Sequence, residues 1–423
     1  MGKRQAMRWA ARLAFLGAAV VLAVGGPVPL WLRRLFPSMS PLAAVCGSIA
    51  QRSWYLGLYW AGPPLILLAL AVWRGRFFCR WVCPAGTLHS IPARVSLGKR
   101  FLRRPISGVI FWTVLFGSLV GAPLLICLDP LSTFNRLVLP LKGLTTAAWL
   151  VPGLMIPVFL VLGFIQPRIW CTHVCPLGYG LDLLLRLRTR RPRLRPIFSR
   201  TRREILAGAV LGVPMALLLK RFGLTRPAPA APPILPPGAR DPASFAALCS
   251  RCYGCVNVCP TGIIRLAGAA DRALGQFFQP EIDFSRGICK EDCHACTRVC
   301  PTGAIALLTR EQKRNRQIGL AVVNQETCVS WANDEACMQC ETPCPYHAIM
   351  PDVNAWGIAR PIVIEDACRG CGACEVACPV TPKAITVRGV KRQRTLSAPV
   401  VPAAAADGSM SGFEEASPSH LTA

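Results

Sequence analysis

The cysteines of this chain are concentrated in one stretch and follow a repeated spacing. Sixteen of the 22 cysteines lie between positions 249 and 378, in four runs that each end in Cys-x-x-x-Cys-Pro. Runs one and four have the Cys-x2-Cys-x2-Cys-x3-Cys-Pro spacing that holds a [4Fe–4S] cluster. We therefore expect four [4Fe–4S] clusters. The predicted ligands are Cys249, Cys252, Cys255 and Cys259 in run one, Cys289, Cys293, Cys296 and Cys300 in run two, Cys328, Cys337, Cys340 and Cys344 in run three, and Cys368, Cys371, Cys374 and Cys378 in run four.

The pairing of the runs is open at this point. In a two-cluster unit, the fourth cysteine of one run ligates the cluster of the other run. Sequential pairing places Cys300 with the first three thiols of run one and Cys259 with those of run two, whereas nested pairing joins run one with run four and run two with run three.

In run three, eight residues separate Cys328 from Cys337, a loop that would alter the solvent access and the potential of its cluster. Short apolar stretches at 263–264, 304–307, 348–349 and 384–385 predict strands and a small α+β fold.

The composition indicates a membrane protein. Hydrophobic residues make up 52% of the chain and the mean hydropathy is +0.40, which is too apolar for an ordinary soluble protein. The net charge of +27 raises the question of nucleic-acid binding. Many basic residues flank apolar segments instead of forming a soluble basic face, so we expect no nucleic-acid partner. A disulfide scaffold does not require the regular spacing of the four runs.

Four apolar segments approach the roughly 20 residues that a helix needs to cross a bilayer. They lie at about 11–32, 54–73, 106–127 and 145–165, and a shorter fifth segment at 205–219 follows an arginine cluster. We expect an α-helical membrane domain of about five transmembrane helices, followed by an α+β ferredoxin-like polyferredoxin domain. The expected divisions are 1–200 for the four-helix part, 201–225 for the fifth helix, 226–245 for a Pro/Ala linker, 246–392 for the four-cluster domain and 393–423 for a disordered tail.

The distribution of arginine predicts how the chain crosses the membrane. The loops after the second and fourth segments are rich in Arg and Lys, whereas the opposite loops hold few. By the positive-inside rule the N-terminus and both basic loops are cytoplasmic, and the cysteine-rich domain is periplasmic if the fifth segment spans. Residues 201–206 resemble a twin-arginine export motif, which suits a domain that crosses the membrane already folded around its clusters.

The four-helix part contains the same short motif twice. Residues 76–86 and 168–178 share the pattern Arg-x-aromatic-Cys-x-x-Val-Cys-Pro-x-Gly. If the two helical hairpins pack side by side, their thiols meet around one further iron–sulfur cluster, whose nuclearity is open; the alternative is a structural or redox-inactive cysteine pair. The four thiols are those of Cys79, Cys83, Cys171 and Cys175.

No histidine lies within an apolar segment, so we expect no haem. Cys46 and Cys127 lie near the opposite face of the membrane from the repeated motifs. They could form a disulfide there, and the alternative for Cys127 is a buried apolar role.

Together these motifs resemble two known protein families. The part before residue 200, with its two Cys-x-x-x-Cys-Pro motifs, resembles NapH-type quinol dehydrogenase subunits. The four runs that follow the export-like motif resemble NapG- and MauM-type periplasmic ferredoxins with four [4Fe–4S] clusters, so the chain is similar to a fusion of the two. The resemblance implies a multi-pass protein of the bacterial inner membrane that carries electrons from membrane quinol to a periplasmic reductase or maturation partner. It would be a component of a quinol dehydrogenase, and its partners would be the lipid bilayer, the quinol pool and a periplasmic redox protein.

One departure from the NapH pattern affects the predicted route. NapH-type proteins usually carry two complete ferredoxin motifs after the second Cys-x-x-x-Cys-Pro, whereas here Cys175 leads directly into the arginine cluster. Because the hydrocarbon core is about 30 Å thick, we expect electrons from a cytoplasmic-side cluster to need a quinone or another carrier. The alternatives are a cytoplasm-facing polyferredoxin for another oxidoreductase, and a non-enzymatic redox sensor or assembly factor. The sequence identifies neither the quinone site nor the terminal acceptor.

Overall fold

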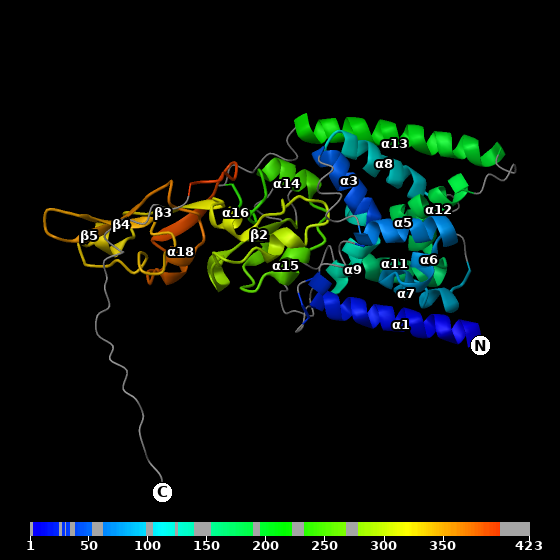
Figure 1. Cartoon of the computed structure of the whole chain (residues 1–423), viewed down its shortest axis with the longest axis horizontal. Helices are drawn as coiled ribbons and strands as arrows, with labels where there is room; N and C mark the ends of the chain where they lie inside the picture. The colour runs from blue at the N-terminus through cyan, green and yellow to red at the C-terminus, as the bar shows by residue number, and fades with distance from the viewer. Residues whose placement is uncertain are drawn as a thin grey trace, which may run out of the picture.

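The computed structural model describes residues 3–24, 28–29, 31–33, 39–52, 62–98, 105–122, 126–138, 154–188, 195–221, 232–267 and 278–397. The described residues before 222 form helices, and those after 231 form short strands, short helices and cysteine-bearing loops. The molecule is elongated, with the helical part at one end and strands β4 and β5 at the other (Figure 1). We call the second region the ferredoxin part.

Helices α1 (Lys3–Val24) and α13 (Arg195–Arg221) lie on opposite sides of the helical part (Figure 1). Five helices lie between them: α3 (Pro41–Gln51), α5 (Gly62–Arg74), α8 (Ser107–Leu119), α9 (Pro130–Val138) and α11 (Met155–Ile165). The two repeated motifs form α6 (Phe77–Trp81), α7 (Pro84–Leu88), the turn Trp170–Val174 and α12 (Pro176–Arg188). Val114, Leu131, Phe134 and Leu181 are fully buried at the centre of this packing.

Among the described residues, one helix is long and apolar enough to cross a membrane, over Gln5–Val24 of α1. The apolar helices α3, α5, α8 and α11 are shorter. The five expected spans therefore stay a prediction. Parts of all four longer expected spans, namely 25–27, 30, 54–61, 123–125 and 145–153, lie outside the described residues. The third is shorter than predicted because α8 ends at Leu119, two residues before Gly121 adopts a φ of 80°.

Helix α13 packs closely along α8 because two glycines leave room for the neighbouring backbone. A Cβ atom at Gly208 would collide with Trp112, and one at Gly212 would lie 2.8 Å from the carbonyl oxygen of Thr113. A Gly-x-x-x-Gly face of this kind is typical of tightly packed membrane helices. The Tyr179 hydroxyl of α12 also donates to Glu204 of α13 at 2.8 Å. The stretch that resembles an export motif is therefore part of a packed helix.

The ferredoxin part contains three two-stranded antiparallel sheets. Strand β1 (Ile264–Leu266) pairs with β2 (Pro280–Ile282), β3 (Gly319–Val323) with β6 (Ile385–Gly389), and β4 (Ile349–Val353) with β5 (Ala359–Val363). Between the strands lie α14 (Pro242–Leu248), α15 (Gly254–Val258), α16 (Arg310–Arg314), α17 (Val329–Ala332) and α18 (Ala373–Ala377). This mixture agrees with the predicted α+β class, and three of the four predicted strands form. The prediction of a strand at 304–307 was wrong, because the N–H of Ala306 donates to Gly238 (3.0 Å) instead of to a neighbouring strand.

Residues at both ends of the ferredoxin part, in the expected linker and in the expected tail, are packed more closely than the sequence predicts. Within the expected linker, Leu235 and Ala239 are buried. The side chain of Gln393, the first residue of the expected tail, donates to the carbonyl oxygens of Leu235 (3.1 Å) and Pro236 (3.0 Å) and accepts from the N–H of Gly238 (2.9 Å). Gln393 thereby satisfies buried backbone groups that would otherwise be unpaired. The rest of the expected tail, from residue 398, lies outside the described residues.

Candidate metal centres

The sixteen cysteines of the four runs sort into four sets of four. The thiols within each set interact electrostatically, and each set combines three thiols of one run with the fourth thiol of another. Set I is Cys249, Cys252, Cys255 and Cys300; set II is Cys289, Cys293, Cys296 and Cys259; set III is Cys328, Cys337, Cys340 and Cys378; set IV is Cys368, Cys371, Cys374 and Cys344. Run one therefore pairs with run two and run three with run four, which answers the question that the sequence left open in favour of sequential pairing.

Two of the sets line open cavities. The four thiols of set II border one cavity, and those of set III border another. Within the described residues, no three His, Cys, Asp or Glu side chains lie close enough together to hold a single metal ion. Each set instead combines three thiols of one run with the fourth thiol of another, which is the ligand pattern of two-cluster [4Fe–4S] ferredoxins.

Backbone N–H groups point at several of the sulfur atoms. Hydrogen bonds to sulfur stabilise thiolates and help to set the potential of a cluster. The loop of run one turns its amides inward because Arg251 and Tyr253 have positive φ angles of 52° and 57°. The N–H of Arg251 donates to Cys249, that of Ile305 to Cys300 and that of Ala348 to Cys344, each at 3.4 Å, and that of Ala321 donates to Cys368 at 3.5 Å.

Burial raises the pKa values of these thiols. For Cys252, burial first and then the charge of Cys300 raise the pKa to about 12. The pKa values of Cys255 and Cys296 are raised well above the usual range by burial first and then by the charges of the other thiols in their sets. Such thiols are protonated and unreactive at neutral pH, and metal binding is what deprotonates them. None of the described cysteines forms a disulfide, and four thiols around one space are the donor set that holds a [4Fe–4S] cluster.

Sets II and IV adjoin each other and connect the two pairs. The N–H of Cys289 donates to the carbonyl oxygen of Cys371 at 2.9 Å. Tyr346 is buried beside them, and its phenol interacts electrostatically with both cysteines. The four sets therefore follow one another in the order I, II, IV, III. The same direction is visible in Figure 1, where α15 carries Cys255 near the helical part and α18 carries Cys374 farther from it.

A buried lysine lies beside set II. Lys313 of α16 is 4% exposed, and its ammonium group donates to the carbonyl oxygens of Lys290 and Glu291. The pKa of Cys289 is raised by burial, and the charge of Lys313 opposes this rise. A cation in this position stabilises negative charge on the sulfur atoms of set II.

Replacing Lys313 by methionine should lower the reduction potential at set II. The reduced form of a cluster carries one more negative charge, so the loss of a buried cation disfavours reduction. A charged hydrogen bond contributes about 1.5–3 kcal/mol, which corresponds to roughly 60–130 mV for one electron. Redox titration followed by electron paramagnetic resonance (EPR) measures the shift. Lys391→Met, which removes an exposed charge away from the thiol sets, should shift the potential far less; equal shifts would contradict the role of Lys313.

The two Cys-x-x-x-Cys-Pro motifs come together in the helical part. Cys83 interacts electrostatically with Cys79, Cys171 and Cys175. The last glycine of each motif, Gly86 or Gly178, donates its N–H to the sulfur of the second cysteine at 3.4 Å. Gly86 is required there because a Cβ would lie 2.8 Å from the carbonyl oxygen of Cys79. We call these four thiols the paired-motif centre.

The first arginine of the repeated pattern joins the two motifs. Arg76 forms a bidentate ion pair with Asp182 of α12, at 2.6 Å to Oδ1 and 2.5 Å to Oδ2. It also donates to the carbonyl oxygen of Cys171 at 3.2 Å. Bidentate pairs of this kind restrict both partners in orientation as well as distance. Arg76 therefore holds the second motif against the first.

Helix α9 connects the paired-motif centre to set I. At its start, buried Asp129 accepts from Ser40 (2.6 Å) and interacts electrostatically with Cys175. Near its end, Arg136 is 4% exposed and donates to the carbonyl oxygens of Ser250 (2.7 Å) and Arg251 (2.9 Å), between the first two thiols of set I. Seven residues of α-helix rise about 10 Å. Asp129 and Arg136 are thus about 10 Å apart along the helix, which places α9 between the paired-motif centre and set I.

A second contact supports the same junction. The side-chain amide of Gln51, at the end of α3, donates to the carbonyl oxygen of Thr302 at 2.5 Å. Thr302 lies two residues after Cys300, the thiol that run two contributes to set I. Gly47 of α3 also lies against Thr302, because a Cβ there would come within 2.6 Å of the same oxygen. Helices α3 and α9 therefore hold set I from two directions.

Sequence reasoning missed the residues that connect the centres. The hydropathy pattern predicts only a loop around Arg136, and no sequence motif singles out Asp129, Lys313 or Tyr346. One signal was available. An aspartate and an arginine seven residues apart lie on one helical face, and both stand in a largely apolar stretch. Lys313 and Tyr346 offer no comparable signal, because their roles depend on contacts with distant segments.

Known protein families match the same regions. A family described as 4Fe-4S dicluster domain matches residues 248–304, which hold runs one and two. A family described as 4Fe-4S binding domain matches residues 361–381, and another of the same description matches both 56–105 and 147–195. The regions 56–105 and 147–195 each contain one of the repeated motifs. The dicluster match agrees with the pairing of runs one and two.

Two relatives show which proteins the chain resembles. It is 35% identical over 204 residues to the methylamine utilization ferredoxin-type protein MauM of Methylobacillus flagellatus, covering 47% of this chain and 84% of the relative. It is 38% identical over 160 residues to the ferredoxin-type protein NapF of Haemophilus influenzae, covering 38% of this chain and 81% of the relative. The chain belongs to the MauM/NapF-type polyferredoxins. As a member of this family it is an iron–sulfur electron-transfer protein. No solved structure gives a significant match.

Proposed function

We propose that this polyferredoxin is bound to a bacterial inner membrane and relays electrons from the quinol pool to a periplasmic redox partner. The observation that carries the proposal is the position of α9 between two centres: Asp129 at its start interacts electrostatically with Cys175, and Arg136 near its end binds the backbone of the set I loop. An electron donor at the helical part would then have a direct route to set I. The apolar helix α1, the basic loops and the export-like motif support the membrane location and the orientation.

In this proposal the residues of the chain hold five centres in one row. Sets I to IV would hold four [4Fe–4S] clusters, and Cys79, Cys83, Cys171 and Cys175 would hold a further iron–sulfur cluster. Bound clusters of this kind supply one-electron transfer. Arg136 and Gln51 hold set I against the helical part, and Tyr346 fills space between sets II and IV. The oxidation of one quinol to quinone releases two electrons and two protons, so two one-electron passages follow each quinol.

The periplasmic location is tested by reporters fused after residue 397. A reporter that is active only outside the cytoplasm, such as alkaline phosphatase, should be active, and a reporter that needs the cytoplasm should not be. The expected orientation follows from the charge asymmetry of the loops. The opposite pattern of reporter activity would contradict the periplasmic location and favour a polyferredoxin that serves a cytoplasmic oxidoreductase.

Reduction by quinol tests the electron source. Anaerobic addition of a reduced quinol to the purified full-length protein should bleach the visible absorption of the clusters within seconds. Cys83→Ser, which removes a thiol of the paired-motif centre, should slow this reduction at least tenfold and leave reduction by dithionite unchanged. If dithionite reduces the clusters of the wild-type protein and no quinol does, the protein is better explained as a redox sensor or an assembly factor.

A further inference from the structure

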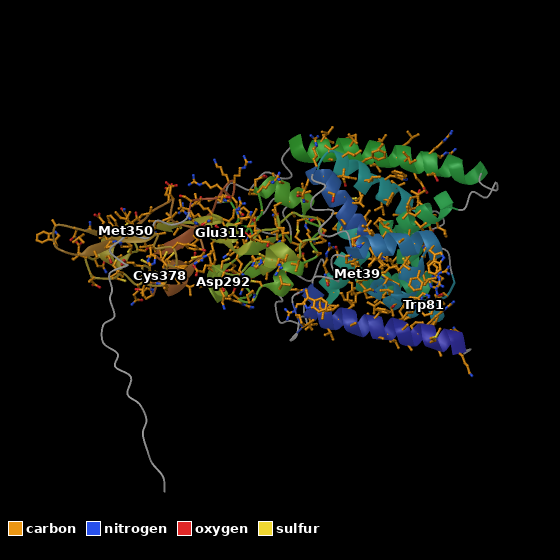
Figure 2. The ribbon with its side chains drawn as sticks, viewed as in Figure 1. Met39, Trp81, Asp292, Glu311, Met350 and Cys378 are labelled. Atoms are coloured by element: carbon orange, nitrogen blue, oxygen red, sulfur yellow. The ribbon has the colours of Figure 1, made fainter. Side chains whose placement is uncertain are left out.

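The end of the molecule farthest from the helical part is an exposed hairpin. Strands β4 and β5 extend beyond the rest of the ferredoxin part (Figure 1), and Met350 of β4 lies at the opposite end of the molecule from Trp81 of the first repeated motif (Figure 2). The side chain of Asn354 closes the turn by accepting from the N–H groups of Trp356 (3.0 Å) and Ile358 (2.9 Å). Trp356 is 82% exposed and Val353 is 61% exposed. The hairpin therefore presents large apolar side chains to solvent.

The extra residues of run three hold this hairpin in place. They include α17, which packs against β5. The indole of Trp331 donates to the carbonyl oxygen of Pro361 (3.3 Å), and the guanidinium of Arg360 lies 4.9 Å from the centre of the Trp331 ring. Arg360 also pairs with Asp334 (2.6 Å), to which Asn354 donates (3.1 Å). The unusual spacing between Cys328 and Cys337 thus forms a support for the hairpin, directly beside set III.

This end is acidic although the protein is strongly basic. Residues 333–363, which include the hairpin, contain four acidic residues and one basic residue, while the whole chain has a net charge of +27. The basic residue is engaged, because Arg360 pairs with Asp334. Asp352 of β4 and Glu335 beside the hairpin are exposed. The surface around Trp356 therefore carries negative charge.

We infer that the hairpin β4–β5 and residues 333–336, together called the distal tip, form the docking surface for a positively charged one-electron redox protein. An exposed tryptophan is a frequent anchor of protein interfaces, and acidic groups around it would steer a basic partner. Set III ends the row of centres, so a partner bound here would face the terminal thiols. Like charges disfavour a second copy of this tip, and anionic lipid repels acidic residues. The inference deepens the proposed function and rests on it for the direction of electron flow.

Binding of a cationic probe tests the distal tip without any electron transfer. The probe is oxidised cytochrome c, a basic redox protein, and the full-length oxidised protein with its clusters is immobilised for surface plasmon resonance at low ionic strength. Trp356→Ala should weaken binding at least tenfold, the size expected for the loss of an aromatic anchor. The double variant Glu335→Gln, Asp352→Asn should weaken binding several-fold and reduce its dependence on salt. Trp356→Phe should restore most of the affinity.

Two controls keep the test specific. Glu311→Gln removes an exposed acid of α16 and Val95→Ala trims an exposed apolar side chain of the helical part, so neither should change the affinity for the probe. Cluster absorption should be the same in all variants. Dithionite-reduced protein should reduce cytochrome c more slowly in the Trp356→Ala variant, whereas ferricyanide, which needs no docking, should be reduced at the wild-type rate.

Three results would overturn the inference. The first is equal binding of the probe by the wild-type protein and the Trp356→Ala variant. The second is Trp356-dependent binding to phosphatidylglycerol vesicles without binding to cytochrome c, which would assign the tip to lipid. The third is self-association that Trp356→Ala abolishes, which would assign the tip to a second copy. These tests use dithionite and never quinol, so a protein that quinol fails to reduce can still dock the probe. Failure of the proposed function is therefore distinguishable from failure of the docking inference.

Discussion

Replacing Cys300 by serine should destroy the cluster held by set I and spare that of set II, although Cys300 belongs to run two. Its thiol interacts with Cys249, Cys252 and Cys255, whereas Cys259 of run one interacts with the thiols of set II. Cys259→Ser should therefore have the converse effect. Each variant should lose about four irons per chain, the content of one [4Fe–4S] cluster. Iron analysis and EPR of the reduced protein measure the loss.

Lys313 identifies which cluster survives, because its ammonium group lies beside set II. In the Cys300→Ser background, Lys313→Met should still lower the potential of one cluster. In the Cys259→Ser background, the same change should have no cluster to act on. Cys127→Ser, which removes a cysteine that belongs to none of the sets, should leave iron content and potentials unchanged. Loss of the Lys313-sensitive signal in Cys300→Ser would show that each run binds its own cluster.

Replacing Arg136 by methionine should slow electron transfer between the helical part and the ferredoxin part while every cluster stays in place. Methionine fills a similar volume but leaves the buried carbonyl oxygens of Ser250 and Arg251 without their donor. An unsatisfied buried group costs about 1–3 kcal/mol, so the contact that holds set I against α9 should loosen. We expect reduction by quinol to slow at least tenfold, as measured by stopped-flow absorption.

Reduction by dithionite separates this effect from damage to the clusters. Dithionite acts from solution, so its rate with Arg136→Met should equal the wild-type rate. Arg286→Met removes an exposed guanidinium of the ferredoxin part and should change neither rate. An unchanged quinol rate in Arg136→Met would mean that electrons do not pass through the contact of α9 with set I. A loss of iron in this variant would mean that Arg136 supports the cluster site itself.

Local spacing predicts which cysteines form one run, but it does not predict which run supplies the fourth thiol of each set. The ligands of one run stand on one tight loop, so their positions are readable from neighbouring residues. The fourth ligand comes from a different run, and its place depends on how β1, α15 and the loop of run two pack together. The same reason explains why Arg136 and Lys313 were missed. Each acts on carbonyl groups or thiols of a distant segment, and hydropathy patterns do not contain that information.

Helix lengths were overestimated for a different reason. The apolar run at 106–127 predicts one long helix, yet α8 ends at Leu119, ahead of Gly121 and its positive φ. Mean hydropathy does not register such a local turn. The reverse error affects the linker, whose Pro- and Ala-rich composition predicts an extended segment. Its second half packs into the ferredoxin part because Gln393 and Ile282 provide partners for its backbone.

A cryo-electron microscopy map of the full-length protein with its clusters would test the central claim most directly. The claim is that the centres form one row, from the paired-motif centre through sets I, II and IV to set III. The map should show four cubane densities, each held by three cysteines of one run and the fourth of its partner run. It should show a fifth dense feature among Cys79, Cys83, Cys171 and Cys175, with α9 between this feature and set I. Density that joins run one to run four, or a paired-motif centre far from set I, would contradict the account.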